Sequence, residues 1–229
     1  MLSEPRTISL LCELVHIPMK HLPEGLREVY NRVCSSCGYE NFIRTPGGAR
    51  IERQQEAGGF SHVSFTGDRI QLTEDHVGIS VEQFARKVAA VLTESVQVLR
   101  IPIVLLQQTT VRVIAMPNSF RSAADFLSQR IFRVPAGDLE AFGRPSNLFG
   151  FRMSLPPTRD DPTSFNIRVE TYLRDRRSLY IENVGTFKAP VQASSLEVVE
   201  RQTLATSELL TDRVIPFLSR YDTRGPETP

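Results

Sequence analysis

Arginine and tyrosine side chains alternate with apolar residues along several predicted strands in the second half of the chain. Because successive residues of a strand point to opposite faces of its sheet, this alternation places the apolar set in the core and the other set on the opposite face. The second set consists of Arg112, Arg152, Arg168, Tyr172 and Tyr180. Guanidinium groups bind phosphates and carboxylates, and aromatic rings stack on flat ligands, so these residues predict a binding face.

Two carboxylates share the predicted face with these arginines. Glu170 and Glu182 fall in phase with Arg168 and Tyr180 along their strands. Opposite charges on neighbouring strands form cross-strand ion pairs, so the pattern leaves two interpretations open. The face is either a solvated surface of ion pairs or a binding site.

Cys34 and Cys37 have the spacing with which two thiolates bind one zinc ion. A structural zinc site needs four ligands, and the sequence holds no second pair of this kind. Cys12 with His16 or His21 would complete a site only if the first strand passes the end of the helix. As a redox pair the two cysteines would need a helix N-terminus to lower the thiol pKa, whereas they fall at a predicted C-terminus. We therefore expect structural cysteines and no bound metal.

No catalytic constellation can be recognised in the sequence. The histidines, which lack metal-ligand spacing, are His16, His21, His62 and His76. The sequence contains no nucleophile elbow, zinc-protease helix, phosphate-binding loop or dinucleotide fingerprint. We therefore predict no catalytic residue and no cofactor, and an enzyme without a recognisable motif is the least favoured alternative.

Composition limits the class of protein. The 229 residues carry a net charge of +1, with 23% charged and 41% hydrophobic residues, which excludes a strongly polybasic or polyacidic chain. Lysine occurs only at Lys20, Lys87 and Lys188, and the other basic residues are arginines, which reflects either genomic base composition or phosphate recognition. No apolar run approaches the ~18 residues of a membrane span, and the N-terminal segment lacks a signal-peptide core. The sequence predicts a cytoplasmic protein without a membrane segment.

The first half of the chain predicts a strand, a helix, two hairpins and a second helix. In order, they cover residues 7–17, 23–38, 40–55, 60–72 and 80–99. Pro23 is tolerated in a first helical turn, and Gly38 is typical of a helix end. Ser80 with Gln83 forms a capping-box pattern at the start of the second helix. The polar side of that helix carries Glu82, Arg86, Lys87 and Glu94.

The second half predicts the same order of elements. They are a strand over residues 103–116, a short helix capped by Ser122 with Asp125, strands over 148–155, 164–173 and 178–184, and a helix over 196–221. Ser194 with Glu197 marks the start of this last helix. Its apolar stripe consists of Leu196, Val199, Thr203, Leu210, Val214 and Phe217. Because one half is too small to cover so long a helix, we expect part of it to pack on the other half or on a second subunit.

An internal echo relates the two halves. Residues 68–78 (DRIQLTEDHVG) and 175–185 (DRRSLYIENVG) match without a gap at Asp68/Asp175, Arg69/Arg176, Leu72/Leu179, Val77/Val184 and Gly78/Gly185. We therefore predict an α+β fold of two pseudo-repeated strand–helix–strands–helix halves, residues 1–101 and 102–221, with a disordered tail at 222–229. The strands form one curved antiparallel sheet with the long helices on one face. The same offset pairs Val63 with Glu170, which face opposite ways, so a bulge or a different loop length must intervene.

Two segments carry a resemblance to a known family. They are GFSHVSFTGDRIQLTEDHVGISVEQF (59–84) and FNIRVETYLRDRRSLYIENVGTF (165–187). With the element order, they resemble a sporadically distributed, functionally uncharacterised family of bacterial and archaeal proteins of about 250 residues. The resemblance implies an α+β plan with the same succession of elements. It implies no activity and no functional residues.

For function, the sequence favours a non-enzymatic binding or interaction module with a regulatory role. Its partner is a ligand, another protein or a second copy of the chain that forms a homodimer through the last helix. The alternative is a nucleic-acid-binding protein that uses the arginine and tyrosine face. A contiguous basic patch free of Glu170 and Glu182 would favour nucleic acid, whereas a deep pocket with a strongly perturbed histidine or carboxylate would favour an enzyme.

Overall fold

The chain has an α+β structure in the computed structural model, which describes residues 1–54, 58–76, 78–144 and 148–223. Its strands are β1 (Arg6–His16), β2 (Asn41–Thr45), β3 (Gly48–Gln54), β4 (Phe60–Thr66), β5 (Arg69–Asp75), β6 (Ile103–Ala115), β7 (Gly150–Leu155), β8 (Ser164–Thr171), β9 (Leu179–Phe187) and β10 (Val191–Gln192). Its helices are α1 (Pro23–Cys37), α2 (Val81–Leu99), α3 (Ala123–Phe126), α4 (Ala136–Glu140), α5 (Glu197–Leu209) and α6 (Ile215–Ser219). Two π-helical turns, η1 (Leu127–Ile131) and η2 (Leu210–Val214), follow α3 and α5.

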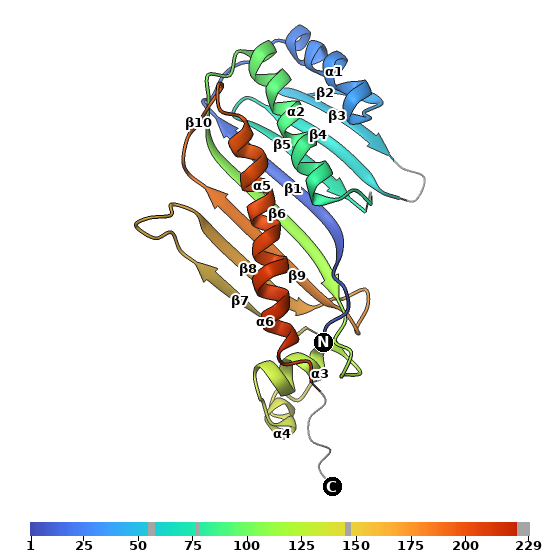
Figure 1. The fold of residues 1–229 in the computed structure, drawn as a ribbon. Coiled ribbons are helices and arrows are strands. Elements are labelled where there is room, and N and C mark those ends of the chain that lie inside the picture. Colours follow the sequence, from blue (N-terminus) through green and yellow to red (C-terminus); the bar gives the residue numbers. More distant parts are fainter. Residues whose placement is uncertain (55–57, 77, 145–147, 224–229) are drawn as a thin grey trace.

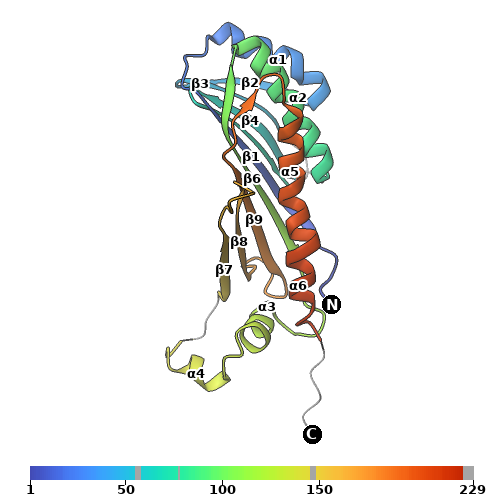
Figure 2. The ribbon, with the colours of Figure 1, turned by 60° about the vertical axis from the view of Figure 1, so that its left-hand side comes forward.

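All the strands belong to one ten-stranded antiparallel sheet, which confirms the predicted fold class and sheet type. The strand order is β2-β3-β4-β5-β1-β6-β9-β8-β7, and β10 pairs with β6 (Figure 1). Helices α1, α2 and α5 cover one face of the sheet, and no described helix covers the opposite face, which we call the bare face (Figure 2). The structure therefore has one helical layer and one sheet layer, with the bare face left as a broad exposed surface.

The capping residues place the first two helices where the sequence predicts them. Pro23 occupies the first turn of α1, and Gly38 ends this helix with a φ of 73°, a conformation that glycine adopts without strain. Ser80 accepts a hydrogen bond from the Gln83 amide, and the Gln83 side chain accepts one from the Ser80 amide. This reciprocal pair satisfies two amides at the start of α2 that have no partner within the helix.

The hydrophobic core fills the space between the sheet and its helices. Fully buried side chains from the sheet include Leu10, Leu14 and Ile181, and α2 contributes Phe84 and Leu92. These strand residues follow the period-two pattern read from the sequence. Among the described helices, none is long and apolar enough to cross a membrane.

The strand order reads alike on the two sides of the central β1–β6 pair. Outward from β1 come β5, β4 and β3, and outward from β6 come β9, β8 and β7; β2 has no counterpart. The gapless residue echo, however, does not pair equivalent positions. Gly78 has a φ of 71° in the segment between β5 and α2, whereas Gly185 lies inside β9, where a Cβ would collide with Thr206 Oγ1. The echoed Val77 lies outside the described residues, and the division at residues 101 and 102 stays a prediction.

The last helix confirms one prediction and corrects two others. It packs on α2 as well as on β6 and β9, so part of it lies on the first half of the chain, as expected. The helix begins at Glu197, and Leu196 precedes it without a side-chain cap, so the predicted Ser194 cap is wrong. Phe217 is 39% exposed, and Leu218 is buried in its place. The π-helical turn η2 inserts an additional residue, which shifts the buried stripe by one position.

We expect Leu210→Asp to lower the free energy of unfolding by about 3 kcal/mol or more, because Leu210 is 1% exposed and a buried carboxylate lacks a partner there. Phe217→Asp is the matched control on the same helix and should cost about 1 kcal/mol or less. Urea unfolding of both variants measures the difference. An equal loss of unfolding free energy in the two variants would show that Phe217 is as buried as Leu210, contrary to the helix orientation described above.

Candidate functional site

The residues predicted to form a binding face do come together on the bare face of the sheet. Arg152 on β7 lies directly opposite Arg168 on β8, which in turn lies opposite Glu182 on β9. Arg112 on β6 lies opposite Glu182 and opposite Ser9 on β1. These residues form one row perpendicular to the strands, and Tyr172 and Tyr180 lie beside it.

Glu182 is the centre of the first group of contacts in this row. It accepts hydrogen bonds from Arg112 Nε at 2.7 Å and from the Tyr180 hydroxyl at 2.8 Å. Arg112 Nη1 also donates to Ser9 Oγ at 3.4 Å. Burial alone would raise the pKa of Glu182, but the two donors outweigh burial and hold the pKa of this carboxyl below its usual value. Glu182 is therefore a fixed negative charge on the face.

Arg168 and the two tyrosines form the second group. Arg168 Nε donates to Glu170 Oε2 at 2.6 Å, and its guanidinium carbon lies 5.5 Å from the centre of the Tyr180 ring. The rings of Tyr172 and Tyr180 stack, with centroids 6.4 Å apart and planes 12° from parallel. These contacts restrict the rotamers of all three side chains before any partner binds.

Apolar side chains run along the middle of the bare face. Val15 on β1 pairs with Leu106 on β6, and Leu11 pairs with Thr110, which pairs with Val184 on β9. These four apolar side chains are half-buried. Glu13 on β1 pairs with Gln108 on β6 and separates these apolar side chains into two groups. Glu13 also forms an ion pair with Arg69 at 3.2 Å, and Arg50 forms one with Glu52 at 2.7 Å. The middle of the face therefore carries two small apolar groups with a polar row between them and charged residues on both flanks.

A hollow of about 370 Å³ opens on the bare face over β7, β8 and β9. Its lining includes Arg152, Ser154, Asn166, Arg168, Glu182 and Val184. Arg152 makes no ion pair with any residue that the structure describes. The hollow thus contains one guanidinium without a counter-charge, next to hydroxyl and amide groups that can donate hydrogen bonds.

A buried polar cluster on the opposite, helix-covered side was missed at the sequence level. Lys87 Nζ lies 2.6 Å from Glu74 Oε1 and 2.9 Å from Ser61 Oγ, and Ser61 Oγ donates to Glu74 Oε1 at 2.7 Å. The ammonium also lies 4.3 Å from the centre of the Tyr39 ring. The prediction that Lys87 lies on the polar side of its helix, away from the core, is wrong, because its ammonium group points to Glu74 and Ser61 on the sheet.

The alternation of residues along β4 and β5 could have predicted this cluster. Ser61 is in phase with Val63 and Phe65 on β4, and Glu74 is in phase with Ile70 and Leu72 on β5. A carboxylate in a core position needs a buried positive partner, and lysine occurs at only three places in the chain. The side chains of Glu74 and Lys87 are 3% and 15% exposed.

The cysteines are free thiols and do not converge with the histidines. Cys37 is half-buried in a hollow of about 390 Å³ beside Lys87, and burial raises the pKa of its thiol. Burial raises the pKa of Cys12 to about 12, and this thiol accepts a hydrogen bond from Thr109. The rings of His16 and His21 lie 5.3 Å apart. Across the described ranges, no group of three or more histidine, cysteine or acidic side chains could hold a metal ion.

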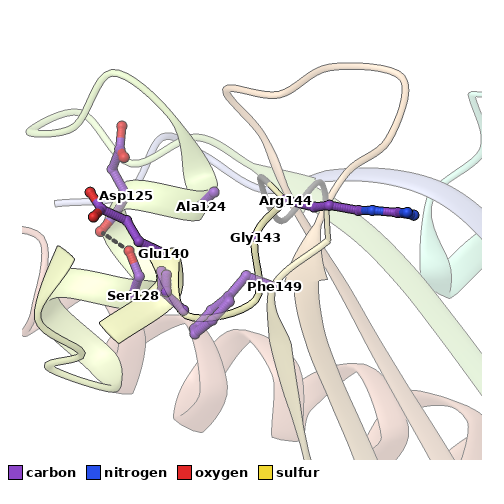
Figure 3. Close-up of a pocket in the computed structure, with 8 residues that line it drawn as sticks. Ala124, Asp125, Ser128, Glu140, Gly143, Arg144 and Phe149 are labelled. Atoms are coloured by element: carbon purple, nitrogen blue, oxygen red, sulfur yellow. Dashed lines mark hydrogen bonds between the residues drawn. The ribbon is translucent and has the colours of Figure 1, made fainter. Parts of the chain in front are cut away.

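A third hollow, of about 590 Å³, lies at the end of the molecule between α3, α4 and β7. Figure 3 shows Asp125, Ser128 and Glu140 on one side of it, with Arg144 directed away from them. The Asp125 carboxylate accepts a hydrogen bond from Ser122 Oγ at 2.7 Å, and Ser128 Oγ donates to the Asp125 carbonyl at 3.4 Å. These contacts belong to the cap of α3, so they hold the helix rather than prepare a reactive group.

Comparison with models of known protein families gave no match, and comparison with curated proteins found no similar sequence. The functional argument therefore depends on the geometry of the bare face and of the buried cluster.

We expect Lys87→Met to lower the free energy of unfolding by about 3–5 kcal/mol, because it leaves the Glu74 carboxylate buried without its cation. The double variant Lys87→Met/Glu74→Leu should recover most of this loss. Lys20→Met, at an exposed lysine, is the control. Chemical denaturation of the four proteins measures the effect, and a Lys87→Met variant as stable as the control would contradict the buried ion pair.

Glu182 should make stability depend on pH in the acid range. Its folded-state pKa is lowered, so its contribution is present above the unfolded pKa and is lost as the pH falls through the folded value. The stability difference between the native chain and Glu182→Gln should therefore shrink between about pH 6 and about pH 3. Glu208→Gln, at an exposed position, should show no such change. A difference that stays constant across this range would rule out the proposed role of the carboxylate.

Proposed function

We propose that this chain is a non-enzymatic binding module that engages a protein partner through the bare face of its sheet. The observation that supports this most directly is the combination, on one face, of the half-buried apolar side chains Leu11, Val15 and Val184 with paired charges and hydrogen-bonding groups. Protein–protein interfaces combine apolar and polar groups in this way.

The arginine and tyrosine side chains of the same face support this proposal. Tyrosine and arginine contribute most often to the binding energy of interfaces. Here Arg112, Arg168 and Tyr180 are held by hydrogen bonds, so a partner would lose less side-chain entropy on binding them. Because both signs of charge occur on the face, a partner must match the pattern, which favours specificity.

The nucleic-acid alternative has less support, because the arginines of the face are balanced by carboxylates. The arginines are Arg50, Arg69, Arg112, Arg152 and Arg168, and the carboxylates are Glu13, Glu52, Asp75, Glu170 and Glu182. Binding to a phosphate backbone depends on cations that are free to replace its counterions. On this face, Glu182 forms an ion pair with Arg112 and Glu170 forms one with Arg168, so these two guanidinium groups are not free to replace counterions.

Five finer predictions from the sequence accompany this proposal. We propose that residues 1–101 and 102–221 arose from one repeated unit, because the strands lie in the same order outward from β1 and β6. The resemblance to the bacterial and archaeal family, the regulatory role and the cytoplasmic location stay predictions. Dimerisation through the last helix has less support, because its buried stripe already packs on the sheet and on α2.

A photo-crosslinking amino acid tests which face binds a partner. We expect the substitution at Tyr172, on the bare face, to crosslink a protein in an extract of the source organism. The substitution at Phe217, which is 39% exposed on the helical side, should not. The purified partner should then bind a folded Leu11→Glu variant at least about tenfold more weakly, because the substitution replaces one of the few apolar side chains of the face with a charge.

Two outcomes would count against the proposal. One is equal crosslinking from both positions, and the other is unchanged affinity of the purified partner for Leu11→Glu. A labelled single-stranded oligonucleotide tests the alternative. Salt-dependent binding that is lost in Arg152→Ala would favour nucleic acid over a protein partner.

A further inference from the structure

Strand β7 forms an edge of the sheet and has an unpaired side. Among the described residues it pairs only with β8, and in Figure 1 no helix lies beside its outer edge. Along one side of an edge strand, the backbone N–H and C=O groups lack strand partners. Four of the six residues of β7 are exposed. This edge can therefore accept backbone hydrogen bonds from another extended chain.

The opposite edge of the sheet differs in this respect. Strand β2 contacts α1, and the Arg27 guanidinium of α1 lies 4.4 Å from the centre of the Phe42 ring on β2. Natural sheets commonly protect their edges with such a covering element, with proline or with lysine. Neither β7 (Gly-Phe-Arg-Met-Ser-Leu) nor β2 (Asn-Phe-Ile-Arg-Thr) contains proline or lysine, so the contact with a helix is what distinguishes the two edges. The edge at β7 is thus the one suited to strand addition.

The charges on β7 indicate what the added strand must carry on the bare face. Arg152 and Arg168 lie directly opposite each other on neighbouring strands, an arrangement in which like charges repel. Arg168 has Glu170 as its counter-ion, whereas Arg152 has none among the described residues. An acidic residue opposite Arg152 on an added strand would supply the counter-charge. Ser154 and Asn166 line the same hollow and can donate further hydrogen bonds.

The other face of β7 indicates the alternate residues of the partner. Phe151, Met153 and Leu155 point to the helical side, and Met153 is 40% exposed. The ring of Phe132, itself 40% exposed, lies 6.1 Å from the ring of Phe151. Apolar side chains of an added strand would cover Met153 and leave less apolar surface in water.

We propose that β7 binds an extended segment of the partner protein as an additional strand, in which acidic and apolar residues alternate. This inference rests on the proposed function, since it names the chemistry of the protein partner. A second copy of this chain fits less well. Pairing β7 with its own copy, with the same faces aligned, would bring Arg152 of one copy opposite or diagonal to Arg152 of the other.

A labelled synthetic peptide of about ten alternating valine and glutamate residues tests the proposal by fluorescence polarisation. It should bind at least about tenfold more tightly than a valine–lysine peptide of the same length. In Arg152→Glu the preference should reverse, whereas Arg159→Glu, at an exposed arginine after β7, should keep it. A valine–glutamate peptide with alternate amides methylated should lose binding, because it cannot complete the backbone ladder.

Equal binding of the two peptides, or full binding of the methylated one, would overturn strand addition. A dimer of the native chain that dissociates in Arg152→Glu would show instead that a second copy occupies the edge. A crosslinked partner whose affinity is lowered by Leu11→Glu but not by Arg152→Glu would leave the proposed function in place and remove this inference. Peptide binding without any partner crosslinked at Tyr172 would support strand addition at β7 and count against the proposed function of the bare face.

Discussion

The pairing of β1 with β6 is the constraint on which the rest of the structure depends. These are the longest strands, at 11 and 13 residues, and they form the central antiparallel pair of the sheet. Their register places Cys12 opposite Thr109 on the covered side and Leu11 opposite Thr110 on the bare side. A shift of one residue would exchange the two faces, so every residue assigned to the bare face depends on this register.

The helices above this pair are positioned by polar contacts as well as by apolar burial. Gln107 Nε2, which has two N–H groups to donate, lies 3.0 Å from Thr109 Oγ1, 3.1 Å from the Val199 carbonyl oxygen and 3.0 Å from Thr203 Oγ1. Gly185 allows α5 to approach β9 closely, since a Cβ there would collide with Thr206. A buried polar group destabilises the fold unless it is hydrogen-bonded. These contacts therefore restrict the rotation of α5 about its axis. Because α5 is held on this side, the other face of the sheet is left open.

The sequence predicts the parts of this structure that local chemistry determines. The caps at Gly38 and Ser80 and the alternation along β8 and β9 depend on residues close in the chain, and they place Arg168 and Tyr180 correctly on one face. The ion pair of Lys87 with Glu74 could not be read in the same way. Its two members are far apart in the sequence pattern and become close only because α2 packs on β5.

The one-residue shift of the buried stripe in the last helix could not be predicted, for a different reason. Its stripe assumes 3.6 residues per turn, and the sequence of η2 carries no mark of the wider π-helical turn that buries Leu218 instead of Phe217. The hollow beside α4 was not predicted either, because the sequence around α4 has no periodic pattern that predicts a helix there. Long-range packing, rather than local preference, determines both features.

The two sides of the sheet distribute their charges differently, and this difference is informative about function. Beside β1, the carboxylate of Glu74 is buried with Lys87, and the sheet edge at β2 contacts a helix. On the β6 side, Arg152 and Arg168 lie on the bare face, and no described strand pairs with the outer edge of β7. A buried ion pair stabilises only the fold around it, whereas an exposed guanidinium without a counter-charge gains energy when a partner supplies one. If the two sides descend from one unit, the first has kept the features of a closed domain and the second those of a binding surface. The search for a partner should therefore begin at β7, β8 and β9.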